Sequence, residues 1–289
     1  MIIDSHAHYA HRVYQRPLRY LTRTEAGYLC REGTREDIFR ELDEANIPCS
    51  IEPGVTLESC KEVLALSREY PGRIFPAVGL HPTRCIYEPQ SAWKTLSALA
   101  REKEVIAIGE TGLDYHHPRQ DQHRFRQTVW FLRQLNLAAK TGLPVILHVR
   151  DAHKQALGIL RHHPARKNGG VIHCFTGSWE VAQQYLALGY HIGIGGSLLQ
   201  LPERSEPLRR VVEKMPLSRL LLETDSPFIL PYCKDVLPAK VLRRARNTSL
   251  ILPAVADEVA RLRGITPQAV CNAATENTVQ VFRLPLTDI

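Results

Sequence analysis

Residues 144–173, PVILHVRDAHKQALGILRHHPARKNGGVIH, contain one complete strand–helix–strand unit and decide the fold. The runs 144–147 and 170–173 are short and largely apolar, as strands buried on both faces are. Between them, residues 152–160 carry apolar side chains at helical spacing. Two neighbouring strands that are joined through a helix run parallel, because the helix carries the chain back along the sheet. A histidine stands at the end of each run.

The same alternation extends in both directions along the chain. Strands are predicted at residues 2–4, 50–52, 74–80, 105–109, 144–147, 170–173, 191–194 and 220–223. Helices are predicted between them, at 35–46, through 63–66, 93–99 and 125–135, and at 152–160, 180–188 and 208–214. Eight such alternations predict an α/β fold, a (β/α)8 TIM barrel, with the chain 1–289 as one domain. The alternative, an open doubly wound sheet, is disfavoured because its glycine-rich phosphate-binding motifs do not occur.

Two segments fall outside this repeat. Residues 239–289 predict additional C-terminal helices, through 252–259 and 268–282, packed on the outside of the barrel. Residues 9–33 are long for a barrel connection, and we expect an inserted loop over the site. This segment holds five arginines and four tyrosines against two glutamates: Arg12, Arg16, Arg19, Arg23, Arg31, Tyr9, Tyr14, Tyr20, Tyr28, Glu25 and Glu32. It is either a solvated surface insertion or a basic, aromatic wall suited to phosphates and unstacked bases.

Composition narrows the class of protein. With 289 residues, 44% of them hydrophobic, the chain is too apolar for a disordered protein. Seven scattered cysteines without a C-x-x-C pair fit neither a disulfide framework nor a cysteine zinc site, and favour a reducing compartment. The sequence shows no signal peptide and no apolar run that could span a membrane, so we expect a cytoplasmic protein. A net charge of +7 is only a weak sign of a polyanionic partner.

Side chains of metal-ligand type stand at predicted strand ends. They are His6, His8, Glu110, His148, His173 and Asp225. A lone histidine is more often a hydrogen-bonded core residue, but six such groups on one barrel rim are not explained in that way. Imidazoles mixed with carboxylates suit zinc, manganese and similar divalent ions. Because six ligands exceed the three or four of a single catalytic zinc, we expect two ions that share a bridging carboxylate.

Five local motifs occur in a fixed order along the chain. They are Asp4-Ser5-His6-Ala7-His8, Gly109-Glu110-Thr111-Gly112-Leu113-Asp114-Tyr115, Pro144-Val145-Ile146-Leu147-His148-Val149-Arg150, His173-Cys174-Phe175-Thr176-Gly177 and Glu223-Thr224-Asp225-Ser226-Pro227. Together they resemble the TatD family of metal-dependent deoxyribonucleases, a branch of the amidohydrolase-like barrels. The resemblance runs from Ile2 to about Phe282, where Glu276-Asn277 also resembles the closing helix of the family.

The resemblance implies a function and divides the ligands. His6, His8 and Asp225 would bind one ion, His148 and His173 the other, and Glu110 would bridge the two. The ions would be zinc, manganese or magnesium. A hydroxide on the metals would attack the phosphodiester, and Asp225 would accept a proton from the attacking water. The implied substrate is DNA, as single strands or 3′ ends, cleaved by a 3′–5′ exonuclease with no membrane association and no obligate protein partner.

Further residues are candidates at the edge of the site. His81 ends the third predicted strand and is a candidate phosphate contact, or else a structural histidine. Arg150 follows His148 by two positions, so it either grips a phosphate or makes an ordinary rim salt bridge. Glu223 precedes Asp225 by two positions and could orient a ligand or a metal-bound water. Asp114 and Tyr115 are interpreted as residues that shape a loop.

The chain departs from the usual family pattern at a few positions. Tyr9 and Ala10 follow His8 in place of an apolar residue and Asp, Lys154 replaces an acidic residue, and Thr248-Ser249 replace Glu-Pro. These departures bear on the choice of substrate. The alternative function is that of a deacylase, lactonase or small phosphoesterase on the same barrel, although a lysine bridge typical of many such enzymes is missing from the predicted strand ends. A binding protein that kept the barrel is a third reading, disfavoured because all six ligands are present.

Overall fold

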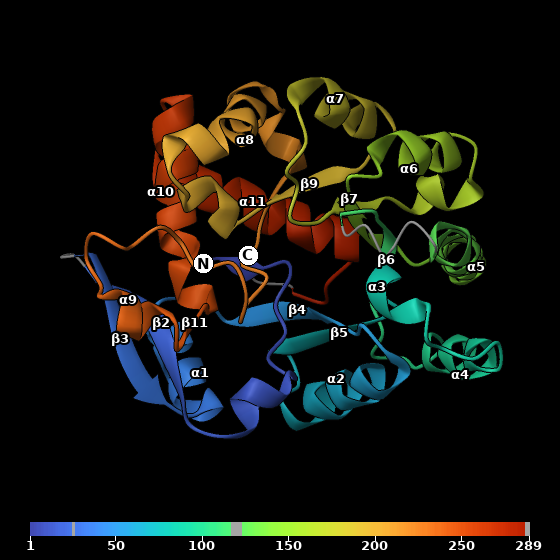
Figure 1. Cartoon of the computed structure of the whole chain (residues 1–289), viewed down its shortest axis with the longest axis horizontal. Helices are drawn as coiled ribbons and strands as arrows, with labels where there is room; N and C mark the ends of the chain where they lie inside the picture. The colour runs from blue at the N-terminus through green and yellow to red at the C-terminus, as the bar shows by residue number, and fades with distance from the viewer. Residues whose placement is uncertain (25–26, 117–122, 287–289) are drawn as a thin grey trace.

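Eight parallel strands form one sheet at the centre of the molecule (Figure 1). The computed structural model describes residues 1–24, 27–116 and 123–286. Round the sheet the strands are β1 (Ile3–Asp4), β4 (Cys49–Pro53), β5 (Ile74–Val78), β6 (Ala107–Asp114), β7 (Val145–Arg150), β8 (Gly170–Ile172), β9 (His191–Ile194) and β10 (Leu220–Leu222). The amide of Ser5 donates to the carbonyl oxygen of Leu222 at 2.9 Å, so the first and last strands meet. The predicted barrel is confirmed.

Helices lie around this sheet. They are α1 (Arg35–Glu44), α2 (Leu57–Glu69), α3 (Pro82–Cys85), α4 (Ala92–Leu99), α5 (Arg124–Thr141), α6 (His153–Leu160), α7 (Trp179–Ala187) and α8 (Pro202–Lys214). Alternate residues of a strand face opposite sides. Val145 and Leu147 of β7 therefore join the large core beneath the helices, whereas Ile146 joins a second core inside the barrel. No helix in the described part of the chain is long and apolar enough to cross a membrane.

The C-terminal helices differ from the prediction in where they pack. Helix α10 (Leu252–Arg263) lies against α8, as expected of an outer helix. The end of α11 (Pro267–Phe282) instead packs on the inward-facing residues of the strands, where Phe282 and Leu284 join the inner core. The prediction that both helices pack outside is therefore wrong for the end of α11, whereas Val270 and Ala274 earlier in the helix belong to the outer core. Its apolar end covers the inner core, which would otherwise be exposed to water at that end of the barrel.

The segment 9–33 is not one loop over the site. A short 3-10 helix, η1 (Arg12–Gln15), is followed by strands β2 (Leu18–Thr24) and β3 (Gly27–Gly33), which pair antiparallel. Strand β11 (Ala245–Arg246) joins β2, and the three strands form a second small sheet beside the barrel (Figure 1). The expected loop is thus wrong beyond residue 17. At the start of β2 buried and exposed side chains alternate, since Leu18 and Tyr20 are buried and Arg19 is exposed. This alternation is typical of a strand, although the segment is basic.

Strand β6 also differs from the prediction, and the difference matters for the site. It spans Ala107–Asp114 rather than 105–109, so Glu110 lies inside the strand and not at its end. The register of β6 against β7 shifts between Ile108 and Thr111. Such an irregularity turns a side chain away from the regular alternation of a strand. The polar run from Gly109 to Gly112 gave no apolar signal that would have extended the predicted strand.

Candidate metal centre

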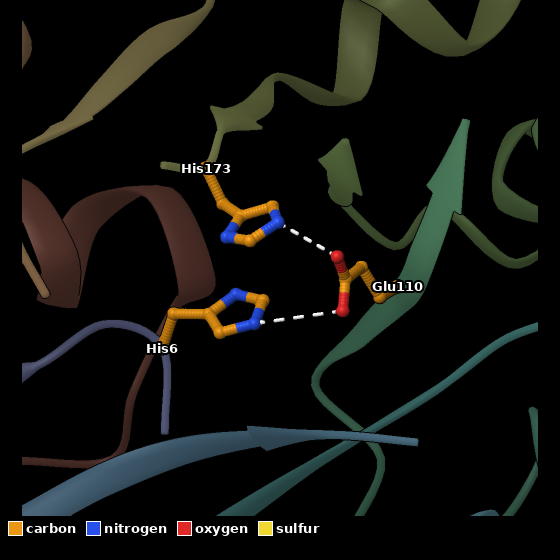
Figure 2. Close-up of side chains that lie close together, drawn as sticks. All are labelled: His6, Glu110 and His173. Carbon is orange, nitrogen blue, oxygen red and sulfur yellow. Dashed lines mark ion pairs between the residues drawn. The ribbon is translucent and has the colours of Figure 1, made fainter. Parts of the chain in front are cut away.

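The six predicted ligands gather at the carboxyl end of the barrel strands. His6 and His8 follow β1, His173 follows β8, and Asp225 follows β10. Glu110 lies within β6, and Figure 2 shows its carboxylate beside the rings of His6 and His173, with one oxygen directed at each ring. With His148 in β7, residues from five separate parts of the sequence thus meet at one rim, as the barrel predicted.

One oxygen of Glu110 faces the N-terminal histidines. Its Oε2 lies 3.6 Å from His6 Nε2, which is also 3.6 Å from Asp225 Oδ1. His8 Nε2 lies 3.3 Å from the same Asp225 oxygen and 3.2 Å from His6 Nε2. The ligand atoms of His6, His8 and Asp225 all fall within 4.8 Å of one another.

The other oxygen of Glu110 faces a different pair of histidines. Its Oε1 lies 2.9 Å from His148 Nδ1 and 2.7 Å from His173 Nε2, and these two nitrogens are 3.2 Å apart. The carboxylate therefore lies between two groups of ligand-type atoms, one for each of its oxygens.

The local backbone fixes Asp225 in this arrangement. Its φ of 54° lies in the left-handed region, which aspartate tolerates better than most residues. The Asp225 amide donates to the carbonyl oxygen of His6 at 2.9 Å, and its own carbonyl oxygen accepts from the amide of Phe228. The loop after β10 is thereby tied to the loop after β1.

The site is buried and strongly polar. Glu110 is 3% exposed and His6 is fully buried. Burial lowers the pKa of His6 to about 4, so its ring is neutral and able to ligate. Burial opposes the charge of His8, but the hydrogen bond and charge of Asp225 outweigh it and raise the pKa of His8 to about 9. For Glu110, too, burial is outweighed, here mainly by the charges of His173 and His81, and its pKa lies well below the ordinary value.

This donor set fits divalent cations. Four imidazoles and two carboxylates converge in a buried place where isolated charges would be costly. Nitrogen and oxygen ligands of this kind suit zinc, manganese and related ions. Each carboxylate is close enough to two or more imidazoles to neutralise a shared cation.

His81 reaches the site as predicted. Its Nε2 lies 3.4 Å from Glu110 Oε1, while its Nδ1 lies 2.7 Å from the hydroxyl of Thr83 and caps α3. The same ring forms a possible ligand group with Glu110 and His148. It faces a cavity of about 590 Å³ over the metal centre, lined also by Arg12 and Phe228.

Of the two remaining candidates, Glu223 lies next to a predicted ligand and Arg150 lies away from the cavity. Arg150 is exposed at the end of β7 and is not among the described residues that line this cavity. Glu223 is buried behind His173, where it accepts a hydrogen bond from the amide of Cys174 and lies 3.9 Å from His173 Nδ1. Burial raises the pKa of Glu223 to about 8. Its distance from His173 Nδ1 is within ion-pair range but too long for a hydrogen bond.

Sequence reasoning missed two carboxylates beside the ligands. Asp114, interpreted as a loop residue, lies in β6 with Oδ2 3.0 Å from His148 Nε2. Glu52, in β4, is fully buried, lines the cavity and accepts hydrogen bonds from the amides of Tyr9 and Ala10. Burial raises the pKa of Glu52 to about 8. The signal for Glu52 was available, since an acidic residue closes the predicted strand 50–52.

A third carboxylate, Asp4, fixes the backbone around the centre. Its oxygens accept from the His6 amide at 3.1 Å, from the amide and hydroxyl of Thr224 at 3.1 and 2.6 Å, and from the hydroxyl of Ser249 at 2.6 Å. The buried hydroxyl of Tyr9 lies 2.8 Å from Ser249 Oγ and accepts from its amide. Tyr9 and Ser249, both of which depart from the family pattern, therefore contact each other.

Comparison with known proteins agrees with this geometry. The family model described as TatD related DNase matches residues 3–283. The chain belongs to this family. A TatD-family protein of Erwinia billingiae, named 3′-5′ ssDNA/RNA exonuclease TatD, is 36% identical over 251 residues, which cover 87% of this chain and 94% of that protein. YabD of Bacillus subtilis, named a metal-dependent hydrolase, is 29% identical and covers 98% of this chain, with all of its own length matched.

Solved TatD-family structures share the fold. The crystal structure of YJJV, a TatD homologue from Escherichia coli, has a TM-score of 0.82 and 29% identity, and covers 98% of both chains. Together with the sequence matches, this identifies the protein as a hydrolytic enzyme of the TatD family that depends on divalent metal.

Proposed function

We propose that the protein is a 3′–5′ exonuclease that hydrolyses phosphodiester bonds at the ends of single-stranded DNA. The observation that carries this is the position of Glu110, whose Oε2 faces His6 while its Oε1 faces His148 and His173. The printed name of the Erwinia relative supports the substrate and the polarity. The buried carboxylate between histidines supports a site for two divalent ions, zinc, manganese or magnesium.

In this proposal the ligands divide as the resemblance implies. His6, His8 and Asp225 would hold one ion, His148 and His173 would hold the other, and Glu110 would be shared by the two groups. Divalent ions bound in this way supply Lewis-acid activation of water and of the phosphoryl oxygens. Asp225 accepts the proton of the attacking water, because its Oδ1 lies at the boundary between the ligand cluster and the open cavity.

The remaining side chains bind and orient. His81 and Arg12 line the cavity and are the candidate contacts for the scissile phosphate, in preference to Arg150, which is not among the described residues that line it. Glu223 and Asp114 orient His173 and His148. His81 and Arg12 would act directly on the substrate in the cavity. Glu223 and Asp114 would act on it through the histidines that they contact.

The test is a substrate screen on the purified protein. After treatment with a chelator, each of Zn²⁺, Mn²⁺ and Mg²⁺ is added to DNA labelled at the 5′ or at the 3′ end, single-stranded and duplex, and to matched RNA. We expect shortening of the 5′-labelled single strand in steps of one nucleotide, and immediate loss of label from the 3′ end. Turnover of acyl-amide or lactone substrates with intact DNA would instead support the alternative hydrolase function.

A further inference from the structure

We propose that a groove beside the metal centre, lined by Arg12, Arg16, Arg243 and Arg246, binds the phosphates of the DNA strand on the 5′ side of the scissile bond. This inference rests on the proposed function, which puts the 3′-terminal nucleotide in the cavity over the metal centre. The groove adds a site for the part of the strand that has not yet been cleaved.

The groove is continuous with the catalytic cavity. It has a volume of about 1110 Å³ and is formed by η1, the turn after β10, and residues 242–246. His11, Arg12 and Phe228 line both the groove and the cavity over the metal centre. A strand whose end occupies the cavity therefore has a direct path into the groove.

The charge of the groove suits a polyanion. Of the described residues that line it, four are arginines and none is acidic. Within the described chain, no carboxylate lies within salt-bridge distance of these four side chains. Arg19, Arg23 and Arg31 of the same N-terminal segment differ, since they pair with Glu32, Asp257 and Glu41. The basic segment noted in the sequence thus divides into a paired part and a part that faces the groove.

An aromatic side chain stands between the two spaces. Phe228 is 49% exposed, more than its ring neighbours His8 and His11, which are only partly exposed. Its ring is T-shaped to those of His8 and His11, with ring centres 6.0 and 5.7 Å away, so neither histidine is stacked on it. Grooves that bind single strands combine cationic side chains for the phosphates with aromatic faces on which bases stack. Phe228 fits the second role.

The test compares two variants of equal charge. Arg16→Gln with Arg243→Gln removes two groove arginines that do not line the catalytic cavity. Arg19→Gln with Arg210→Gln removes two exposed arginines that pair with Glu32 and Glu206. Each pair lowers the net charge from +7 to +5 (7 − 2). Thermal unfolding of both variants checks that the fold is intact.

Binding is measured by fluorescence anisotropy with labelled single-stranded DNA of three and twelve nucleotides, in EDTA so that no strand is cleaved. The groove variant should bind the 12-mer roughly tenfold or more weakly at low salt, and the slope of log Kd against log salt should fall by about 1.4, or ~0.7 per lost phosphate contact. The control variant should bind as the wild type does.

Three results would overturn the proposal: unchanged binding of the 12-mer, an equal loss in both variants, or an equal loss for the trimer and the 12-mer. Wild-type turnover of the 12-mer, with metal added back, separates this inference from the proposed function. A wild type that shows the groove effect but leaves DNA intact would contradict the nuclease and keep the groove. A wild type that degrades DNA while the groove variant binds normally would support the nuclease and contradict the groove.

Discussion

At the scale of single residues, Glu110 and Asp225 can be distinguished by the number of ions that each is proposed to hold. Glu110→Gln removes the charge that faces both histidine groups, whereas Asp225→Asn affects only the group of His6 and His8. We expect both variants to lose at least about a thousandfold in DNA turnover. Metal analysis after dialysis should give about one ion per chain for Asp225→Asn and fewer for Glu110→Gln.

A control for these variants is Glu104→Gln, which removes a surface carboxylate that pairs with Arg68. It should keep both turnover and metal content. Full activity in Glu110→Gln would contradict the shared carboxylate, and equal metal content in the two site variants would contradict the division of ligands.

Asp114 is predicted to act through His148. Its Oδ2 lies 3.0 Å from His148 Nε2, and a carboxylate behind a metal-bound imidazole holds the ring and raises its basicity. Asp114→Asn should weaken metal binding by about 10–100-fold with little change in the unfolding midpoint of the metal-free protein. Titration with Mn²⁺ provides the measurement. Saturating metal should restore most of the turnover, and a variant that stays inactive at saturation would exclude a purely positioning role.

The contact between Tyr9 and Ser249 makes a prediction about stability. Tyr9→Phe removes the hydroxyl that accepts from the buried Ser249 amide, so about 1–3 kcal/mol should be lost from the free energy of unfolding. Ser249→Ala removes the other side of the hydroxyl pair. Urea unfolding of the single and double variants should give a coupling of about 1 kcal/mol, since the residues share one network. Additive losses would show that the two departures from the family pattern are independent.

At the scale of helices and strands, the sequence located most elements but not the edges that shape the site. Apolar runs revealed the eight barrel strands because both faces of each strand are buried. The polar half of β6 was missed, since Glu110 and Asp114 are kept there by partners from other strands and not by hydrophobicity. The meeting of the six proposed ligands at one rim was predictable from their places after apolar runs. The position of Glu52 at the end of a predicted strand was a signal in the sequence, whereas Asp114 is assigned to the site only by its contact with His148.

Gly112 in β6 is predicted to be required for the close approach of β6 to β7. Its φ is 149°, and a Cβ at this position would lie 2.0 Å from the carbonyl oxygen of His148. Gly112→Ala should therefore cost about 2 kcal/mol or more of stability and displace His148. Gly158→Ala in α6 is the matched control, because nothing lies within 4 Å of the added Cβ. Calorimetry should show a lower Tm for Gly112→Ala alone, and equal Tm values would contradict the steric account.

At the scale of the whole molecule, His191 is expected to contribute to acid sensitivity. Burial, and next the charge of Arg219, lower its pKa to about 4, against about 6.5 in an unfolded chain. The folded state therefore favours the neutral ring. Its contribution to stability is complete above pH 6.5 and is lost as the pH falls towards 4, by about 2 kcal/mol at pH 5.

The measurement is urea unfolding of wild type and His191→Asn at pH 7 and pH 5. The variant should lose less stability between the two pH values, and the difference between the two losses isolates His191 from the other histidines. An identical loss in both proteins would mean that His191 titrates normally in the folded state.

The junction of the first and last strands has a consequence for how the enzyme is made. Asp4 bonds to Thr224, 220 positions later, and the Thr275 hydroxyl donates to the carbonyl oxygen of Met1. A chain still on the ribosome carries His6 and His8 long before Asp225 is synthesised. We expect the nascent protein to be unable to hold its full metal complement, so that nuclease activity begins only after nearly the entire polypeptide has been released.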